Sequence, residues 1–179
     1  HPSRRFRLTG VTGTNGKTTT VTLLHRLFSS LGYLTGCFTT IRNYIGYETV
    51  EATHTTPDPI QLNRIMKEMA DKGCQYVFME VSSHALIQQR IAGLTFAGGI
   101  FTNITHDHLD YHKTFEEYLK AKKLFFDGLT DGAFACINAD DRNGRIMVQN
   151  TTALVKYFGI RSMADCKGST METHGDGTL

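Results

Sequence analysis

The sequence predicts an α/β fold in which a mostly parallel central sheet carries helices on both faces. Apolar runs of strand length alternate with segments of helical periodicity, and short connections join them. A glycine-rich loop separates the first strand from the first helix. Of the 179 residues 40% are hydrophobic, which is enough for one core. We therefore expect a single domain over residues 1–179, with a small β subregion from about residue 153.

The first strand, loop and helix form one unit. The pattern predicts a short strand at Phe6–Thr9, a loop over Gly10–Thr20 and a helix that starts near Thr18 and ends at Gly32. The loop therefore lies at a helix N-terminus, where backbone amides attract anions. This arrangement is typical of a P-loop nucleotide-binding fold.

The residues of this loop suit a polyphosphate. Its glycines let the backbone approach phosphate oxygens, Lys17 neutralises charge, and the Thr18 hydroxyl is placed to hold Mg²⁺. Val11 stands where the common pattern has glycine, so the loop is a variant, Gly-x-x-Gly-x-x-Gly-Lys-Thr. A glycine-rich turn that merely precedes a lysine is the alternative. The residues expected to bind ATP are Gly13, Thr14, Asn15, Gly16, Lys17, Thr18 and Thr19.

The remaining elements follow in order along the chain. Strands are expected at 33–43, 76–81, 97–103 and 133–138, and helices from Pro57–Pro59 to Gly73, at 114–126 and at 141–149. Beyond Thr151, residues 154–159 and the glycine-rich tail indicate a small β excursion outside the parallel sheet.

Charge and cysteine content exclude several classes of protein. The 19 basic and 17 acidic residues are scattered and give a net charge of +2, so we expect no nucleic-acid partner. No apolar run approaches the roughly 20 residues of a membrane span, and no signal-peptide pattern opens the chain. The four cysteines form no C-x-x-C pair, so reduced thiols and a cytoplasmic protein without a membrane partner are expected.

Glu80 ends the most apolar predicted strand. An unpaired carboxylate there would carry a large desolvation penalty, which a cation would remove. A carboxylate at the end of a strand next to a phosphate loop commonly serves Mg²⁺. The alternative is that Glu80 lies just past the strand and caps the next helix with Ser82 and Ser83.

The segment His106–His112 holds three imidazoles and two carboxylates in the order His-Asp-His-Leu-Asp-Tyr-His. Such density favours a metal site. A metallohydrolase with a His-x-His-x-Asp-His pattern is one alternative, although Tyr111 interrupts the pattern and only His174 remains downstream. A polar exposed loop with incidental histidines is another.

Lys122 falls on the apolar stripe of the helix predicted at 114–126. A lysine on a buried stripe must extend its ammonium to water, find a carboxylate or lose its charge. The first outcome is the usual one, and a functional lysine is the alternative. The apolar positions that define the stripe are Phe115, Tyr118, Leu119, Phe125 and Phe126.

Several motifs in one order resemble the Mur ligase family, and within it most closely the MurE group. They are Thr-Gly-Thr-Asn-Gly-Lys-Thr-Thr at the loop, Thr55-Thr-Pro-Asp-Pro, Glu80-Val-Ser-Ser-His-Ala-Leu, Phe101-Thr-Asn-Ile-Thr-His-Asp-His-Leu-Asp-Tyr-His and Ala121-Lys122. The resemblance covers essentially the whole chain but only the central ATPase domain of that family. It implies that the domains binding the uridine nucleotide and the incoming amino acid lie outside these residues.

The resemblance implies an ATP-dependent amide ligase of peptidoglycan synthesis. A carboxylate of UDP-MurNAc-L-Ala-D-Glu would form an acyl-phosphate, and a diamino acid would displace phosphate. Lys17, Glu80, His108 and Lys122 would be catalytic. Thr18 and Glu80 would serve one Mg²⁺, and Glu80 or its neighbours with His108 a second. Lys122 matches the family's lysine that reacts with CO₂, and its carbamate could hold a metal or orient the acyl-phosphate. His106 stands where Arg is more usual and is not expected to be a ligand.

The resemblance also implies the muramoyl-dipeptide contacts, which are Thr55, Thr56, Ser82, Gln88 and Arg90. Hydroxyls and an amide can bond a peptide, and Arg90 can pair with a carboxylate; a solvated helix face is the alternative for Gln88 and Arg90. Asn138 and Asp140 receive no role. The whole enzyme is expected to be a cytoplasmic bacterial monomer. A folylpolyglutamate synthase-like ligase and a nucleotide-binding module without turnover remain alternatives.

Overall fold

The computed structural model describes residues 1–52, 54–105, 112–169, 173–174 and 177–178. Its main sheet has nine strands, and the predicted α/β class is confirmed. β1 (Arg7–Thr12) lies in the middle, parallel to β5 (Tyr76–Glu80) on one side and to β6 (Gly98–Phe101) on the other. The loop after β1 therefore lies between the loops that follow its two neighbours.

The sheet extends to both sides of this central trio. Next to β5 come β2 (Thr35–Phe38), β3 (Arg42–Ile45) and β4 (Glu48–Glu51), and next to β6 come β7 (Phe134–Asn138), β8 (Leu154–Gly159) and β9 (Cys166–Lys167). A separate antiparallel pair consists of β10 (Thr173–His174) and β11 (Gly177–Thr178).

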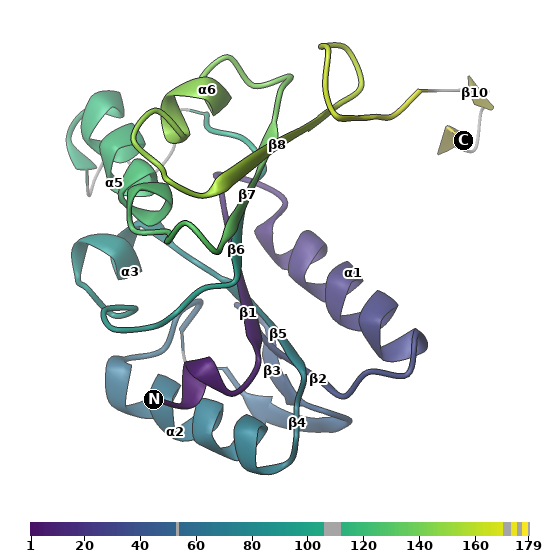
Figure 1. The fold of residues 1–179 in the computed structure, drawn as a ribbon, viewed down its shortest axis with the longest axis vertical. Helices are drawn as coiled ribbons and strands as arrows, with labels where there is room; N and C mark the ends of the chain where they lie inside the picture. Colours follow the sequence, from purple (N-terminus) through teal and green to yellow (C-terminus); the bar gives the residue numbers. More distant parts are fainter. Residues whose placement is uncertain (53, 106–111, 170–172, 175–176, 179) are drawn as a thin grey trace.

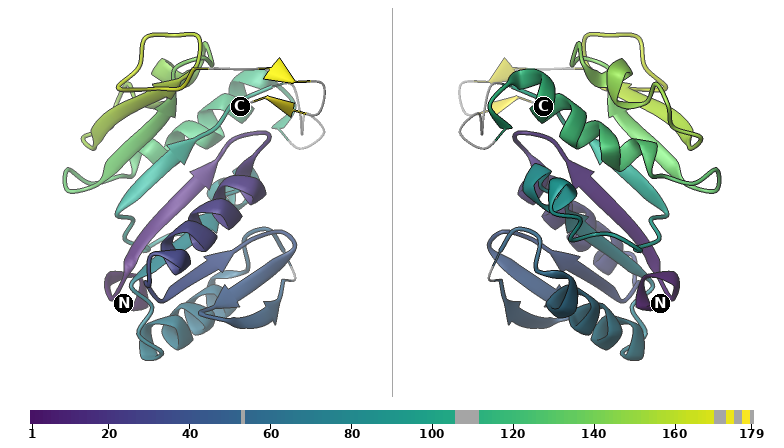
Figure 2. Two further views of the ribbon diagram at one scale, coloured as in Figure 1. Left: turned by 90° about the vertical axis from the view of Figure 1, so that its right-hand side faces the viewer. Right: turned by 90° about the vertical axis from the view of Figure 1, so that its left-hand side faces the viewer.

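Helices cover the two faces of the sheet unequally. Figure 1 shows α1 (Lys17–Ser30) on one face, and α2 (Pro59–Asp71), α3 (Ser83–Ile87), α5 (Phe115–Asp127) and α6 (Gly144–Met147) on the other. The side views of Figure 2 show α1 crossing the central strands at an angle on its face. Among the described residues, no helix combines the length and the apolar character that a membrane crossing requires.

Two predicted elements are shorter or divided. Residues 33–43 do not form one strand, because β2 and β3 pair antiparallel across a turn in which the backbone N–H of Thr39 donates to Asn43 Oδ1. The helix expected at 141–149 is reduced to α6. The Asp141 carboxylate accepts the backbone N–H groups of Ile104 and Asn143, which holds the start of that segment in a turn.

The β excursion predicted at 154–159 is wrong. β8 continues the main sheet and pairs in parallel with β7 from Leu154 to Phe158. Alternate residues of β8, Val155 and Tyr157, pack against the hydrophobic core beneath α5 and α6. The strand therefore belongs to the parallel sheet because one of its faces completes that core.

The apolar stripe predicted for the helix of Lys122 is confirmed in α5. Tyr118, Phe125 and Phe126 are buried, and the helix lies close to the sheet because glycines face it. A Cβ at Gly10 would lie 2.5 Å from Phe125 Cζ, and a Cβ at Gly99 would lie 2.7 Å from Phe125 Cε1. This close approach brings the N-terminal half of α5 to the phosphate loop.

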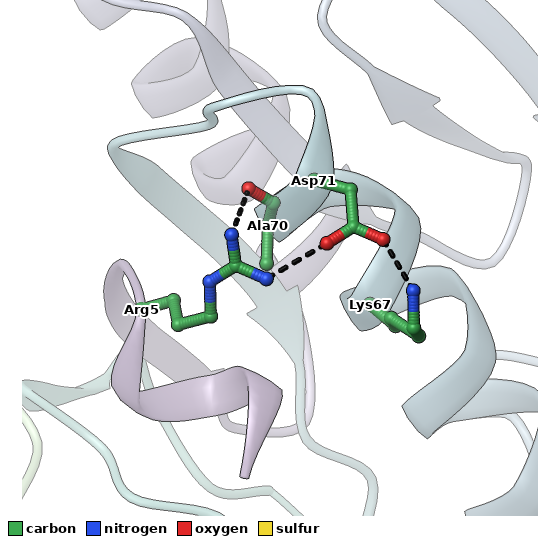
Figure 3. A network of polar contacts seen from close by, with 4 residues as sticks. All are labelled: Arg5, Lys67, Ala70 and Asp71. Carbon is green, nitrogen blue, oxygen red and sulfur yellow. Dashed lines mark hydrogen bonds and ion pairs between the residues drawn. The ribbon is translucent and has the colours of Figure 1, made fainter.

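Surface charges attach the N-terminus to the far end of α2. A short 3-10 turn, η1 (Pro2–Arg4), precedes Arg5, which donates from Nη1 to Asp71 Oδ1 at 2.7 Å and from Nη2 to the carbonyl of Ala70 at 3.2 Å. Lys67, one turn earlier in α2, pairs with the other oxygen of Asp71 (Figure 3). These side chains are largely exposed, so the network contributes little stability.

Candidate functional site

A cavity of about 590 Å³ opens at the carboxyl ends of the central strands. In parallel sheets this edge is where ligands bind, because the loops that follow neighbouring strands meet there. Most of the site residues predicted from sequence line this cavity together. They are Thr14, Asn15, Gly16, Lys17, Thr18, Thr55, Thr56, Glu80, Ser82, Arg90 and Lys122.

The phosphate loop adopts a backbone that only glycine accommodates easily at two positions. Gly13 has φ 153° and Gly16, the N-cap of α1, has φ 85°. A Cβ at Gly13 would lie 1.9 Å from Thr102 Oγ1, so a side chain there would collide with the loop after β6. Gly13 lies behind the cavity wall, and Thr19 is exposed on α1; neither lines the cavity.

The loop after β6 holds the phosphate loop through Asn103, a residue of the Phe101–His112 motif to which no role was assigned from the sequence. Asn103 accepts the backbone N–H of Asn15 at its Oδ1 at 3.0 Å and donates from Nδ2 to the carbonyl of Asn15 at 3.1 Å. Its own carbonyl accepts the backbone N–H of Thr14 at 2.8 Å. Thr102 Oγ1 donates to the same Asn15 carbonyl at 2.7 Å. The sequence signal that could have identified Asn103 is its position in the loop directly after a strand that lies next to β1.

Asn138 and Asp140, which received no role from sequence, support neighbouring loops. Asn138 donates from Nδ2 to the carbonyl of Thr102 at 2.7 Å, beneath the contact with the phosphate loop. The Asp140 carboxylate accepts three consecutive backbone N–H groups, those of Ile160, Arg161 and Ser162. These bonds hold the pKa of Asp140 well below its usual range. Both residues have structural roles here.

Lys17 and Lys122 converge on one carbonyl oxygen of the phosphate loop. The Nζ atoms of both lysines donate to the carbonyl of Gly13 at 2.9 Å, and Lys17 also donates to that of Thr14 at 2.8 Å. Lys122 is only 1% exposed and its Nζ lies 4.6 Å from the centre of the Tyr118 ring. The interpretation that Lys122 extends its ammonium to bulk water is therefore wrong, because the group turns inward to the loop.

Glu80 is 1% exposed, and its carboxylate is held by the loop after β2. Its Oε1 accepts the backbone N–H of Thr40 at 2.8 Å, and Thr40 Oγ1 donates to Oε2 at 3.2 Å. The helix-capping alternative for Glu80 is wrong, because Ser82 is the N-cap of α3 and accepts the N–H of Ala85. Glu80 instead lines the cavity together with Lys17 and Lys122.

Four of the five predicted substrate residues line the cavity, and their surroundings differ. Thr56 is fully buried; its hydroxyl donates to the carbonyl of Glu80 at 2.9 Å and so attaches this loop to β5. Arg90 donates from Nη1 to the carbonyl of Thr56 at 2.8 Å and from Nε to Gln88 Oε1 at 2.8 Å. Gln88 does not line the cavity and acts on it through Arg90.

The histidine-rich segment lies mostly outside the described residues. His106 and His108 cannot be placed, and the same holds for the side chain of His174. His112 is buried, with its Nε2 at 2.8 Å from Ser83 Oγ, beside the cavity. Within the described ranges, no group of three or more His, Cys, Asp or Glu side chains could hold a metal ion, and the four cysteines are unpaired.

The chemistry of the lining favours an anionic ligand with a divalent cation. Three cationic side chains, Lys17, Arg90 and Lys122, face one carboxylate, Glu80, among the described residues that line the cavity. The Glu80 carboxylate and the Thr18 hydroxyl supply oxygen ligands of the kind that Mg²⁺ takes beside a phosphate. The residues present therefore fit a Mg²⁺–nucleotide complex at the start of α1.

Known proteins similar to this chain fall in one family. The Mur ligase middle domain family matches residues 11–179. The UDP-N-acetylmuramoyl-L-alanyl-D-glutamate–2,6-diaminopimelate ligase of Cytophaga hutchinsonii is 61% identical over 172 residues, which are 96% of this chain and 35% of that protein. The ligase of the same name from Bacteroides thetaiotaomicron is 56% identical over the entire chain and 37% of its own length. The chain thus spans about a third of these curated relatives.

Solved structures agree with the fold. A structure of a ligase with the same name has a TM-score of 0.81 and 27% sequence identity, and covers 97% of this chain and 38% of its own. FolC from E. coli in complex with DHPP and ADP has a TM-score of 0.60 at 17% identity, and the match covers 99% of this chain and 50% of that chain. That second likeness is one of fold alone, so it does not favour the folylpolyglutamate synthase alternative. Because the family match starts directly after the first loop glycine and continues past Lys122, the chain belongs to the Mur ligase family as its middle domain.

Proposed function

We propose that this chain is the ATP-binding middle domain of a cytoplasmic ligase that joins 2,6-diaminopimelate to UDP-N-acetylmuramoyl-L-alanyl-D-glutamate. The observation that carries the proposal is the convergence of Lys17, Glu80 and Lys122 on one cavity at the phosphate loop. The substrates are those in the names of relatives that are 56% to 61% identical. The domains that would bind the uridine nucleotide and diaminopimelate would correspond to the parts of those relatives that this chain does not span.

The proposed reaction has two steps within the cavity. A carboxylate oxygen of the dipeptide attacks the γ-phosphorus of ATP, which forms an acyl-phosphate and releases ADP. The amine of diaminopimelate then attacks the acyl carbon, loses a proton and displaces phosphate. Lys17 would stabilise charge on the transferring phosphoryl group, and Arg90 would orient the dipeptide through a carboxylate.

Mg²⁺ would neutralise the phosphate oxygens so that an anion can attack an anion. Thr18 and Glu80 would hold one ion, and His108 with Glu80 or its neighbours a second. Thr40 donates to both oxygens of Glu80 and so fixes the orientation of the carboxylate, which supports a fixed position for this metal ligand. Thr18 is half-buried in the first turn of α1 and lines the cavity, where its Oγ1 would lie next to the bound phosphates in the proposed complex.

Lys122 would act as a carbamate. Its neutral Nζ would attack the carbon of CO₂, forming an N–C bond and releasing one proton to solvent. Both this nitrogen and that of Lys17 donate to the Gly13 carbonyl, so two ammonium groups would repel each other across a short distance. The carbamate replaces one of these positive charges by a negative one and keeps an N–H for the Gly13 carbonyl.

The test uses the full-length protein, with ADP release and tripeptide formation as the two readouts. ATP, Mg²⁺, the muramoyl-dipeptide and diaminopimelate should give both products, whereas a folate and glutamate should give neither. Lys122→Ala should abolish the product, and Lys120→Ala, on the exposed side of the same helix, should retain it. Mass spectrometry in bicarbonate should locate an added carboxyl group on Lys122. ATP turnover that forms no amide with any amine would contradict the proposal.

Residues 1–179 alone provide a second test of the proposed function. It should bind ADP but form no tripeptide, because two substrate-binding parts of the relatives are missing from it. Tripeptide formation by residues 1–179 alone would show that the division of labour between domains is wrong.

A further inference from the structure

Thr40 lies beside Glu80 in the cavity, although no motif pointed to it. It belongs to the turn between β2 and β3, and its side chain is accessible from the cavity. Its backbone N–H reaches one oxygen of Glu80 and its hydroxyl reaches the other. A single residue therefore fixes the rotation of the carboxylate as well as its position.

The turn that carries Thr40 is itself held on both sides. Thr39 Oγ1 accepts the backbone N–H of Arg42 at 3.0 Å, and the backbone N–H of Thr39 donates to Asn43 Oδ1 at 3.3 Å. Thr39 and Asn43 are buried. Thr40 is thus presented to Glu80 by a preformed turn, which is the arrangement that orients a ligand with little loss of entropy on binding.

The hydroxyl of Thr40 has a second neighbour. Its Oγ1 lies 3.1 Å from Thr55 Oγ1 and 3.2 Å from Glu80 Oε2. A threonine hydroxyl has one proton, so it donates to only one of these oxygens at a time. The Thr40 hydroxyl donates either to Thr55 Oγ1 or to Glu80 Oε2, so these two oxygens compete for its one proton, and this competition links Thr55 to the carboxylate.

We propose that Thr40 is a positioning residue that orients Glu80 for a divalent cation and couples Glu80 to Thr55. This proposal rests on the role of Glu80 in the proposed function. It adds a residue that acts through Glu80, and a hydrogen-bonded link between Glu80 and Thr55, which are separate in the sequence. Loss of the Thr40 hydroxyl removes one of the two bonds that fix the carboxylate and breaks the link to Thr55.

The test measures Mn²⁺ affinity of the full-length protein by electron paramagnetic resonance, with ADP present and no dipeptide. Thr40→Val keeps the shape and the backbone N–H but loses the hydroxyl, and should weaken Mn²⁺ binding by about tenfold, as loss of a group that orients a metal ligand does. Thr40→Ser keeps the hydroxyl and should bind Mn²⁺ like the wild type. Thr49→Val on exposed β4 is the matched control.

A double-variant comparison tests the coupling. Thr55→Val should strengthen Mn²⁺ binding modestly in the wild type, because the Thr40 proton is then left for Glu80, and should have no effect in the Thr40→Val background, which lacks that proton. Equal Mn²⁺ affinity of the Val and Ser variants at position 40 would overturn the positioning role. If the effects of the two Val substitutions on Mn²⁺ affinity multiply in the double variant, the coupling is overturned.

A Glu80→Gln variant distinguishes failure of the Thr40 proposal from failure of the metal role proposed for Glu80. If Glu80→Gln loses Mn²⁺ affinity and Thr40→Val does not, the role of Thr40 is wrong and that of Glu80 stands. If Glu80→Gln binds Mn²⁺ as tightly as the wild type, the metal role of Glu80 in the proposed function fails, and the Thr40 proposal fails with it.

Discussion

The molecule contains two clusters of opposite charges whose surroundings differ sharply. Arg5, Lys67 and Asp71 form ion pairs on the surface, with 46% to 70% of each side chain exposed. Lys122 and Glu80 at the cavity are each 1% exposed. The surface charges are paired with each other, whereas the contacts of the two cavity residues include a backbone carbonyl for Lys122 and a backbone N–H and a hydroxyl for Glu80.

This difference separates exposed charges that join two elements from buried charges that line a cavity. Water screens the surface pairs, so their removal changes little. In the cavity, the protein holds cations and a carboxylate apart at fixed positions, and a low dielectric strengthens their interaction with whatever binds. Four substitutions test this contrast between the cavity and the surface. Three change the phosphate loop or a residue that holds it, one changes the surface network, and they follow from the largest expected effect to the smallest.

Lys17→Ala should have the largest effect. Its ammonium caps the phosphate loop through the carbonyls of Gly13 and Thr14 and faces the cavity. Removing a charge that stabilises the transferring phosphoryl group should lower kcat of the full-length enzyme by about 10²- to 10³-fold or more. Steady-state ADP release measures it, with Lys120→Ala as control. Unchanged ADP affinity together with full activity would contradict the phosphate-loop interpretation.

Gly13→Ala should have the second-largest effect. The new Cβ would meet Thr102 Oγ1 at 1.9 Å, at a φ of 153° that side chains rarely adopt. Strain of about 1–3 kcal/mol should distort the loop and weaken ADP binding. Isothermal calorimetry measures this, and Gly132→Ala, where a Cβ meets no atom within 4 Å, is the matched control. Equal ADP affinities of the two variants would show that the loop does not need this backbone.

Asn103→Ala should have an intermediate effect. It removes the two side-chain bonds to the backbone of Asn15 but leaves the carbonyl that holds Thr14. Each bond contributes about 0.5–1.5 kcal/mol, so ADP affinity should fall by roughly tenfold. Asn150→Ala, on an exposed turn, is the control. A loop that binds ADP equally well in both variants would mean that Asn103 does not preorganise it.

Asp71→Asn should have the smallest effect. The pKa of Asp71 is lowered by hydrogen bonds from Lys67 and then Arg5, so its contribution to stability is present above the unfolded-state pKa of about 3.9 and is lost as pH falls through the lower folded value. Tm at neutral pH should therefore stay almost unchanged, and the small difference from wild type should vanish in acid. A loss of several degrees at neutral pH would show that the surface network matters more than its exposure indicates.

Much of the fold could be predicted because periodicity and glycine placement are local properties. The phosphate loop, the helix of Lys122 and the strand ending at Glu80 follow from spacing that is visible in the sequence. Other elements depended on contacts with distant residues. Strand β8 joins the parallel sheet because Val155 and Tyr157 complete a core formed by α5 and α6, and residues 33–43 divide because Asn43 closes a turn onto Thr39.

The sequence by itself determined that the chain has a phosphate loop, a buried carboxylate and a lysine on an apolar stripe, since each follows from residue type and local spacing. Only the tertiary structure decided that Lys122 turns inward to Gly13, that Thr40 holds Glu80 and that Asn103 holds Asn15. These contacts join segments that lie 40 to 109 positions apart. Their partners are chosen by the order of strands in the sheet, which brings the loops after β2, β5, β1 and β6 to one edge.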